Sequence, residues 1–315
     1  MPQAERLTGI GFALAVHGGA GRIPRDEVGR SRAASYHDGL RRALTAGRGI
    51  LAAGGSALDA VTEAVATLED DPLFNAGRGS VFTRAGTQEM DACVMDGTER
   101  RAGAVAGVFG PRNPVLAARA VMERSRHVLL IGEGALAFCR ENGLAFCEPG
   151  YFHSGARWRE LQRALQQPGR EQPQYGTVGA VARDGRGNLA AATSTGGMTG
   201  KEPGRVGDTP IIGAGTYAEN AICAVSATGH GEFFIRHAAA FAIAARLRYA
   251  GQSLDQAARA VIDELAAAGG FGGVVAVDRD GALVLPFSTA GMYRGFVRDG
   301  TAIHTAIYDE PYQSE

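Results

Sequence analysis

The sequence predicts an α/β fold in which helices cover β-sheets from the outside. Short apolar runs of small and β-branched residues are typical of buried strands, and segments with apolar residues at helical spacing lie between them. The order strands, helices, strands occurs twice, on either side of a polar segment at about 149–175. This order fits two sheets or one shared sheet, so a four-layer α-β-β-α sandwich and a three-layer α/β fold are both open.

In the first half, the predicted strands are apolar runs at residues 10–16, 90–97, 101–109 and 127–132. The stretch HGGAG at 17–21 reads as a glycine-rich turn that ends the first strand. Helices are predicted at about 31–53, 56–68 and 114–123, because each begins or ends at a helix-capping signal. These signals are Gly54 and Gly55 after the first helix, Ser56 before the second, and Asn113 with Pro114 at the third.

Residues 149–176 form a polar segment rich in Arg, Gln and Pro, which we expect to be a variable, exposed linker. At Gly176–Thr177 it changes at once into the apolar run Val178–Ala182, typical of a strand buried on both faces. Further elements follow in the second half. Strands are predicted at 177–185, 188–194, 221–229, 272–287 (as a pair) and 304–308, and helices at about 231–249 and 253–268.

The composition excludes several classes of partner. A formal net charge of -1 gives no electrostatic basis for binding nucleic acid or an acidic membrane surface. The four cysteines show neither a CxxC pair nor metal-ligand spacing, as expected of reduced thiols in a cytosolic protein. The apolar stretch LTGIGFALAV at 7–16 is too short to span a bilayer and lacks a signal-peptide cleavage site. We therefore expect a cytoplasmic protein.

Common cofactor and catalytic motifs are incomplete. STGGMTGKE at 194–202 resembles a phosphate loop but has Thr195 and Glu202 where that loop requires glycine and serine or threonine. HGGAGR has Pro24 at the third glycine position of a dinucleotide turn. The sequence contains no GxSxG elbow and no HExxH pair. The remaining candidates for catalysis are hydroxyl side chains of the C-terminal half.

Thr177 is the candidate nucleophile. Taken alone, it reads as an ordinary β-branched strand residue. If the Gly176–Thr177 bond is cut, however, Thr177 gains an α-amine with a pKa of about 7.7 to 8.0, which can act as the base for its own hydroxyl. Nucleophile and base then belong to one residue, so no His–Asp partner is needed. The absence of a side chain at Gly176 leaves its carbonyl open to attack.

Other polar residues of the C-terminal half could complete such a site. Thr228 and the Gly229 amide, at a predicted strand-to-helix turn, could stabilise an oxyanion, and Thr195 offers a second hydroxyl. Arg205 and Asp208 could clamp the carboxylate and ammonium of an amino-acid-like substrate. Taken singly, these stretches also fit a plain turn and a capped helix start.

These motifs closely resemble those of the plant-type L-asparaginase/isoaspartyl peptidase family, the type III asparaginases among the N-terminal-nucleophile (Ntn) hydrolases. The resemblance covers nearly the whole chain except about 149–175. It is carried by HGGAG, ALDAVTEAV, DPLFNAGRGSVFT, DACVMDG, AGAVAGV, NPVLAARAVME, GTVGAVA, TSTGGMTGKEPGRVGDTPIIGAGTYAEN, ATGHGE and LPFSTAGMYRG. The resemblance implies the four-layer α-β-β-α sandwich. It also implies one domain over 1–315, cleaved into an α subunit of 1–176 and a β subunit of 177–315.

The resemblance assigns a role to each candidate residue. Catalysis is assigned to Thr177, Thr195, Thr228 and Gly229, and autocleavage to the Gly176–Thr177 bond. Substrate binding is assigned to Arg205, Asp208, Gly231 and Asn75. The family has no catalytic cofactor, but a structural sodium ion is expected on the main-chain carbonyls of Leu68, Glu69, Asp71, Phe74, Ala76 and Arg78. The mature form is expected to be a homodimer of cleaved αβ units.

The implied activity is hydrolysis of L-asparagine to aspartate and ammonia, and of β-aspartyl dipeptides to aspartate and an amino acid. Glycosylasparaginase is the nearest alternative, which the absence of a secretory signal and of a disulfide framework disfavours. A taspase-like endopeptidase shares the nucleophile. An uncleaved relative that binds amino acids is an alternative of a different class. No nucleic acid or membrane partner is expected.

Overall fold

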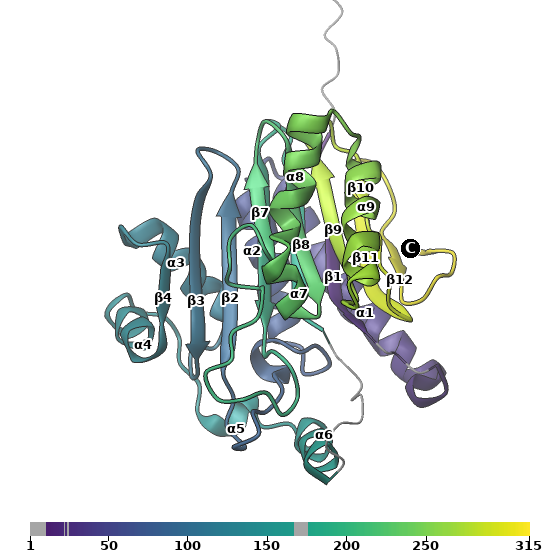
Figure 1. Cartoon of the computed structure of the whole chain (residues 1–315). Helices are drawn as coiled ribbons and strands as arrows, with labels where there is room; N and C mark the ends of the chain where they lie inside the picture. The colour runs from purple at the N-terminus through teal and green to yellow at the C-terminus, as the bar shows by residue number, and fades with distance from the viewer. Residues whose placement is uncertain (1–10, 22, 24, 167–175) are drawn as a thin grey trace, which may run out of the picture.

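The computed structural model describes residues 11–21, 23, 25–166 and 176–315. Within these residues the chain forms two β-sheets with helices on their outer faces (Figure 1). The larger sheet has nine strands in the order β13-β12-β11-β1-β5-β6-β2-β3-β4, and the smaller has four in the order β10-β9-β8-β7. Every strand pair is antiparallel except β3 with β4.

The bounds of the elements are as follows. The larger sheet comprises β1 (Ala13–Gly21), β2 (Met90–Asp96), β3 (Arg101–Val108), β4 (Leu129–Ile131), β5 (Val178–Arg183), β6 (Leu189–Thr195), β11 (Gly291–Arg298), β12 (His304–Ala306) and β13 (Gln313–Ser314). The smaller sheet comprises β7 (Thr216–Glu219), β8 (Cys223–Gly229), β9 (Gly272–Asp278) and β10 (Leu283–Val284). The helices are α1 (Arg25–Ala52), α2 (Ala57–Glu69), α3 (Pro114–Arg124), α4 (Gly132–Glu141), α5 (Pro149–Phe152), α6 (Gly155–Gln166), α7 (Gly231–Arg236), α8 (Ala239–Ala250), α9 (Leu254–Ala267) and the 3-10 turn η1 (Gly77–Gly79).

The layers follow from strand alternation. In β1, Leu14 and Val16 face the core beneath α1 and α2, whereas Ala13 and Ala15 face the smaller sheet. Side chains of a strand point alternately to its two faces, so a strand covered on both sides must be apolar throughout. Helices α8 and α9 cover the outer face of the smaller sheet (Figure 1). The prediction of a mixed α/β fold is therefore confirmed, with two sheets flanked by helices.

The prediction that HGGAG forms a turn is wrong. These five residues belong to β1, which runs on to Gly21 and pairs with β11 over its whole length. The register shifts between His17 and Gly19, and Gly19 has a φ of 113°, a conformation that favours glycine. The glycines thus allow a bulge within a central strand instead of ending it.

The linker prediction also needs correction. Residues 149–166 form α5 and α6, and Phe152 and Arg157 are buried there, so this part is not an exposed linker. Residues 167–175 lie outside the described residues. The helix predicted at 231–249 is divided into α7 and α8 at Ala238, whose φ is 46°. Strands β7, β11 and β13 and helix α4 were not predicted.

Most other elements match the sequence-based prediction. Helix α2 begins after Ser56, whose hydroxyl accepts a hydrogen bond from the Asp59 amide at 3.0 Å. Asn113 stands at the N-cap of α3, although its side chain makes no capping hydrogen bond.

Across the described residues, no helix is both long and apolar enough to cross a membrane.

Candidate active site

Thr177 lies at the head of the central strand of the larger sheet. It immediately precedes β5, which pairs with β1 on one side and β6 on the other. The registers pair His17 with Gly179 and Val178 with Ser194. Continued in the same antiparallel sense, they place Thr177 opposite Thr195. Both threonines are buried. The expected nucleophile and the second hydroxyl therefore end two neighbouring strands.

The Gly176–Thr177 junction is closely packed against two other strands. A Cβ atom on Gly176 would collide with the Thr228 hydroxyl and lie 2.8 Å from the Ala20 amide nitrogen. A Cβ atom on Gly19 would lie 2.7 Å from the carbonyl oxygen of Gly176. Real Cβ contacts are not this short, so both positions require glycine. This packing places the backbone of Gly176 beside the hydroxyl of Thr228.

Thr228 and Gly229 end strand β8. Thr228 is fully buried and accepts a hydrogen bond from the Ala20 amide at 3.1 Å. Gly229 has a φ of 155° and its backbone packs against Phe271 and Gly272 too closely for a side chain. Helix α7 begins two residues later, at Gly231. A buried hydroxyl beside the Gly176–Thr177 junction is a suitable donor for a developing oxyanion.

A chain of buried hydrogen bonds leads away from Thr177. The Nδ1 of His17 donates to the Thr177 carbonyl at 2.9 Å, and its Nε2 contacts the Ser226 hydroxyl at 2.8 Å. Ser226 in turn contacts Thr193 at 2.7 Å, and Thr216 donates to Thr193 at 2.7 Å. All four partner side chains are buried. Sequence reasoning missed this chain, because its members lie on four separate strands and form no contiguous motif.

Burial fixes the protonation of His17. It lowers the pKa of His17 to about 3, although the hydrogen bond to Thr177 acts in the opposite direction. A neutral ring has one donor and one acceptor nitrogen, and a carbonyl can only accept. Nδ1 therefore carries the proton, and Nε2 accepts from Ser226. The resulting hydrogen bonds all run in one direction towards the Thr177 carbonyl.

Arg205, Asp208 and Gly231 form a second cluster. A Cβ atom on Gly231 would lie 2.9 Å from both the Arg205 guanidinium and the Asp208 carboxylate. Asp208 is buried, and its Oδ2 oxygen has no hydrogen-bond partner in the described part of the chain. Burial raises the pKa of Asp208 to about 7, and the nearby Arg205 counteracts this only in part. The free carboxylate oxygen offers a site for a cation such as a substrate ammonium.

Arg205 is already engaged by a neighbour. Its guanidinium makes a bidentate ion pair with Glu232, with distances of 2.9 and 3.0 Å. Sequence reasoning did not assign Glu232 to the site. A substrate carboxylate must therefore share the guanidinium with Glu232 or displace it.

Asn75 connects the loop after α2 to the segment that follows Thr195. Its side-chain amide donates to the Gly197 carbonyl at 2.7 Å and accepts from the Val81 amide at 3.0 Å. The Gly197 amide donates to the Thr195 hydroxyl at 2.9 Å. Asn75 is thus linked to the Thr195 hydroxyl by two successive hydrogen bonds, through the carbonyl and the amide of Gly197.

The loop after α2, where the sequence predicts a main-chain sodium site, is tightly packed around its glycines. A Cβ atom on Gly77 would lie 2.6 Å from the Glu69 carbonyl oxygen, and one on Gly79 would collide with the Phe74 carbonyl oxygen. Both positions therefore require glycine, because the loop backbone packs directly against these carbonyls. No cluster of His, Cys, Asp and Glu side chains in the described ranges could hold a metal ion. Any such site therefore depends on the main chain.

Comparison with known proteins points to one family. A family model described as asparaginase matches residues 10–307. The isoaspartyl peptidase of Salmonella typhimurium is 53% identical over 308 residues, covering 94% of this chain and 98% of that protein. The isoaspartyl peptidase of Escherichia coli is 52% identical, and the match covers 94% of this chain and 96% of that protein. A plant-type L-asparaginase of Thermococcus kodakarensis is 44% identical, and the match covers 91% of this chain and 97% of that protein. The chain therefore belongs to the plant-type asparaginase/isoaspartyl peptidase family.

Proposed function

We propose that this chain is a self-processing threonine amidohydrolase. It hydrolyses L-asparagine to L-aspartate and ammonia, and β-aspartyl dipeptides to L-aspartate and an amino acid. The relatives named isoaspartyl peptidase and L-asparaginase support this activity, because the similarity spans nearly their whole length. The observation that carries it is the Gly176–Thr177 junction, which lies at the head of β5 against the Thr228 hydroxyl.

The proposed architecture is the α-β-β-α sandwich of the Ntn hydrolases, formed as one domain over 1–315. Maturation divides it into subunits 1–176 and 177–315. In this step the Thr177 hydroxyl attacks the Gly176 carbonyl carbon, and the peptide bond is exchanged for an ester. Water then hydrolyses the ester, leaving a Gly176 carboxylate and a free Thr177 amine. The close packing of Gly176 supports this step, since reacting atoms must be held near contact distance.

In turnover, the neutral α-amine of Thr177 takes the proton of its own hydroxyl. The oxygen attacks the carbon of the substrate's β-amide, and Thr228 and the Gly229 amide stabilise the oxyanion. The leaving nitrogen takes the proton from the Thr177 amine and departs as ammonia or an amino acid. Water then hydrolyses the β-aspartyl ester and restores the Thr177 hydroxyl. Thr195, opposite Thr177 in the strand register, assists the nucleophile through its hydroxyl.

Substrate recognition depends on the second cluster. Arg205 binds the α-carboxylate, Asp208 binds the α-ammonium through its unpartnered oxygen, and Gly231 leaves space between them. Asn75 supports the site from the loop after α2. The α-groups are shared by asparagine and β-aspartyl dipeptides, which explains why one clamp serves both substrates.

The loop after α2 would hold a structural sodium ion, and the active form would be a homodimer of cleaved αβ units. Sodium would be held by carbonyl oxygens of Leu68, Glu69, Asp71, Phe74, Ala76 and Arg78. The ion would fix the loop that carries Asn75 and takes no part in proton transfer. Catalysis itself needs no cofactor, since the nucleophile, base and oxyanion donors are all provided by the chain.

A four-substrate assay tests the proposed function. L-Asparagine, a β-aspartyl dipeptide, a glycosylated asparagine and a folded protein are each incubated with the purified protein, and ammonia, aspartate and fragments are measured. We expect the first two to be hydrolysed. Preferential cleavage of the glycosylated asparagine would indicate a glycosylasparaginase. Preferential cleavage of the folded protein would indicate a taspase-like endopeptidase. Binding of amino acids without hydrolysis would indicate an uncleaved binding protein.

A further inference from the structure

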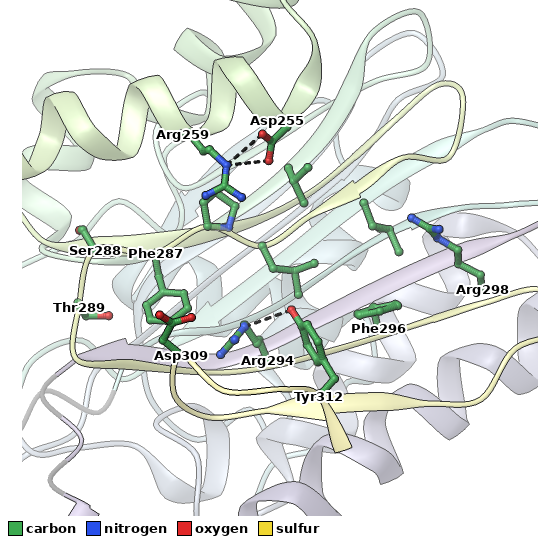
Figure 2. Close-up of a pocket in the computed structure, with 14 residues that line it drawn as sticks. Asp255, Arg259, Phe287, Ser288, Thr289, Arg294, Phe296, Arg298, Asp309 and Tyr312 are labelled. Atoms are coloured by element: carbon green, nitrogen blue, oxygen red, sulfur yellow. Dashed lines mark hydrogen bonds and ion pairs between the residues drawn. The ribbon is translucent and has the colours of Figure 1, made fainter. Parts of the chain in front are cut away.

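A cleft of about 610 Å³ lies at the open edge of the two sheets, and its walls contain none of the proposed site residues. Its walls come from the start of α9, from β10 and the segment after it, from β11 and from the C-terminal segment (Figure 2). The residues that matter for its chemistry are three arginines, two aspartates and three aromatic side chains. They are Arg259, Arg294, Arg298, Asp255, Asp309, Phe287, Phe296 and Tyr312.

The arginines of β11 reach the cleft because of strand alternation. Arg294, Phe296 and Arg298 are two residues apart, so they share one face of the strand. The opposite face carries Tyr293 and Val297 into the core beneath α1. On the cleft side, β11 thus presents two cations, Arg294 and Arg298, on either side of Phe296.

Arg294 is buried and held in a fixed orientation. Its side chain lies over the rings of Phe287 and Tyr312, at 4.7 and 5.2 Å from their centres (Figure 2). Its Nε donates to the Tyr312 hydroxyl at 3.3 Å, and its Nη1 donates to the Met292 carbonyl at 3.1 Å. The remaining nitrogen, Nη2, has no hydrogen-bond partner in the part of the chain that the structure describes. A cation held in this way is preorganised to receive an acceptor.

The charge of Arg294 is not neutralised by an ion pair. Arg259 pairs with Asp255 at 2.9 Å, but no carboxylate of the described residues lies within 4.0 Å of the guanidinium of Arg294 or Arg298. Arg294 is only 4% exposed, and a buried charge without a counter-ion is costly. The aromatic rings repay part of this cost through cation–π contacts. An anion bound at Nη2 would offset more of this desolvation cost.

We propose that this cleft is a second binding site, specific for a small organic carboxylate that carries an apolar or aromatic group. The carboxylate binds Arg294 at Nη2, with Arg298 adding long-range attraction. The apolar group lies against the aromatic and aliphatic walls, which include Phe287, Phe296 and Leu285. Asp309 at the cleft opposes the carboxylate by its negative charge. The site is independent of the proposed amidohydrolase chemistry, because it shares no residue with it.

Binding of 3-phenylpropionate tests the proposal, because this probe has a carboxylate and an aromatic ring but no ammonium for Asp208. Isothermal titration of the full-length protein is expected to show saturable binding of the carboxylate and at least tenfold weaker binding of 3-phenylpropionamide. Equal affinity for the acid and the amide would overturn the proposal, since the guanidinium would then contribute nothing.

Three variants locate the binding. Arg294→Gln is expected to weaken binding at least tenfold, whereas Arg279→Gln, which removes an exposed arginine from a different cleft, should leave it unchanged. Arg205→Gln should also retain binding, which separates this cleft from the proposed active site. Loss of binding in Arg205→Gln with retention in Arg294→Gln would show that the probe occupies the active site and would refute the proposal.

Asp309→Asn provides a test that does not depend on the folding of an Arg294 variant. Asp309 is exposed, so the substitution leaves the core intact. Removal of a negative charge at the cleft should tighten binding of the carboxylate about two- to fourfold. Unchanged or weaker binding would mean that the carboxylate does not enter this cleft.

Discussion

The Nδ1 nitrogen of His17 donates a hydrogen bond to the main-chain carbonyl of Thr177 across 2.9 Å, between the first strand of the chain and the head of β5. His17 is fully buried, and its other nitrogen is fixed by Ser226. This contact restrains the backbone of Thr177, the proposed nucleophile, at its carbonyl. We therefore predict that His17 is a positioning residue, which acts through the backbone of Thr177.

Replacement of His17 by Phe should lower kcat and leave KM nearly unchanged. The substitution removes the buried donor of the Thr177 carbonyl, at about 1–3 kcal/mol for an unsatisfied group, whereas the Ser226 hydroxyl keeps its contact with Thr193. If that energy is expressed at the nucleophile, kcat falls about ten- to hundredfold. KM is expected to stay within about twofold because Arg205 and Asp208 are not contacted.

His17→Asn serves as the matched control, since its amide can still donate to the Thr177 carbonyl. We expect it to recover part of the lost kcat in steady-state assays of asparagine hydrolysis. A role in folding alone would instead lower the melting temperature in both variants and leave kcat per folded molecule unchanged.

Gly176→Ala should block or strongly slow self-cleavage. The new Cβ would meet the Thr228 hydroxyl and the Ala20 amide, both of which belong to strands that cannot move freely. Denaturing electrophoresis over time measures the effect as persistence of the full-length chain. Gly185→Ala is the control, because a Cβ there meets no atom within 4 Å. Cleavage of both variants at the wild-type rate would mean that the junction is not constrained as described.

Arg205→Ala should raise KM for asparagine about a hundredfold while self-cleavage proceeds normally, because the precursor presents no free α-carboxylate to this residue. Arg84→Ala is a suitable control. Arg84 is an exposed arginine paired with Glu202 and should not affect either step. Equal losses of processing and substrate affinity in Arg205→Ala would contradict its assignment to the substrate.

Binding of the product L-aspartate should weaken as the pH falls below about 7. Burial raises the pKa of Asp208 to about 7, so acid protonates the carboxylate and removes its attraction for the α-ammonium. The inhibition constant should rise up to tenfold per pH unit on the acid side. Asp208→Asn should bind weakly at every pH. A wild-type inhibition constant that is flat between pH 5 and 8 would rule out this role for Asp208.

Much of the fold could be predicted because the strands and helices carry local signals. The small, β-branched run of β5 and the serine before α2 are examples, and both were identified with nearly correct bounds. HGGAG misled prediction because glycines signal turns in general, whereas here they permit a bulge between two paired strands. Helix α6 has a polar surface with few buried residues, so its composition resembled that of a linker.

The candidate site was predictable only in part. Residues with distinctive neighbours, such as Thr177 and Arg205, could be proposed as site residues from the chain alone. His17 and Ser226 are 209 residues apart, and only the sheet pairing brings them together. Arg294 gives no signal either, because an arginine in a strand is expected to face solvent. Such long-range contacts depend on topology, which local patterns do not specify.

The most direct test of the account is N-terminal sequencing and intact-mass measurement of the purified protein, followed by the same measurement on Thr177→Ala. The wild-type protein should give two fragments, the second beginning at Thr177, together with release of ammonia from asparagine. The variant should remain one folded, inactive chain. An active wild-type protein with an unbroken backbone, or a Thr177→Ala chain that still divides at residue 176, would contradict the assignment of Thr177 as nucleophile.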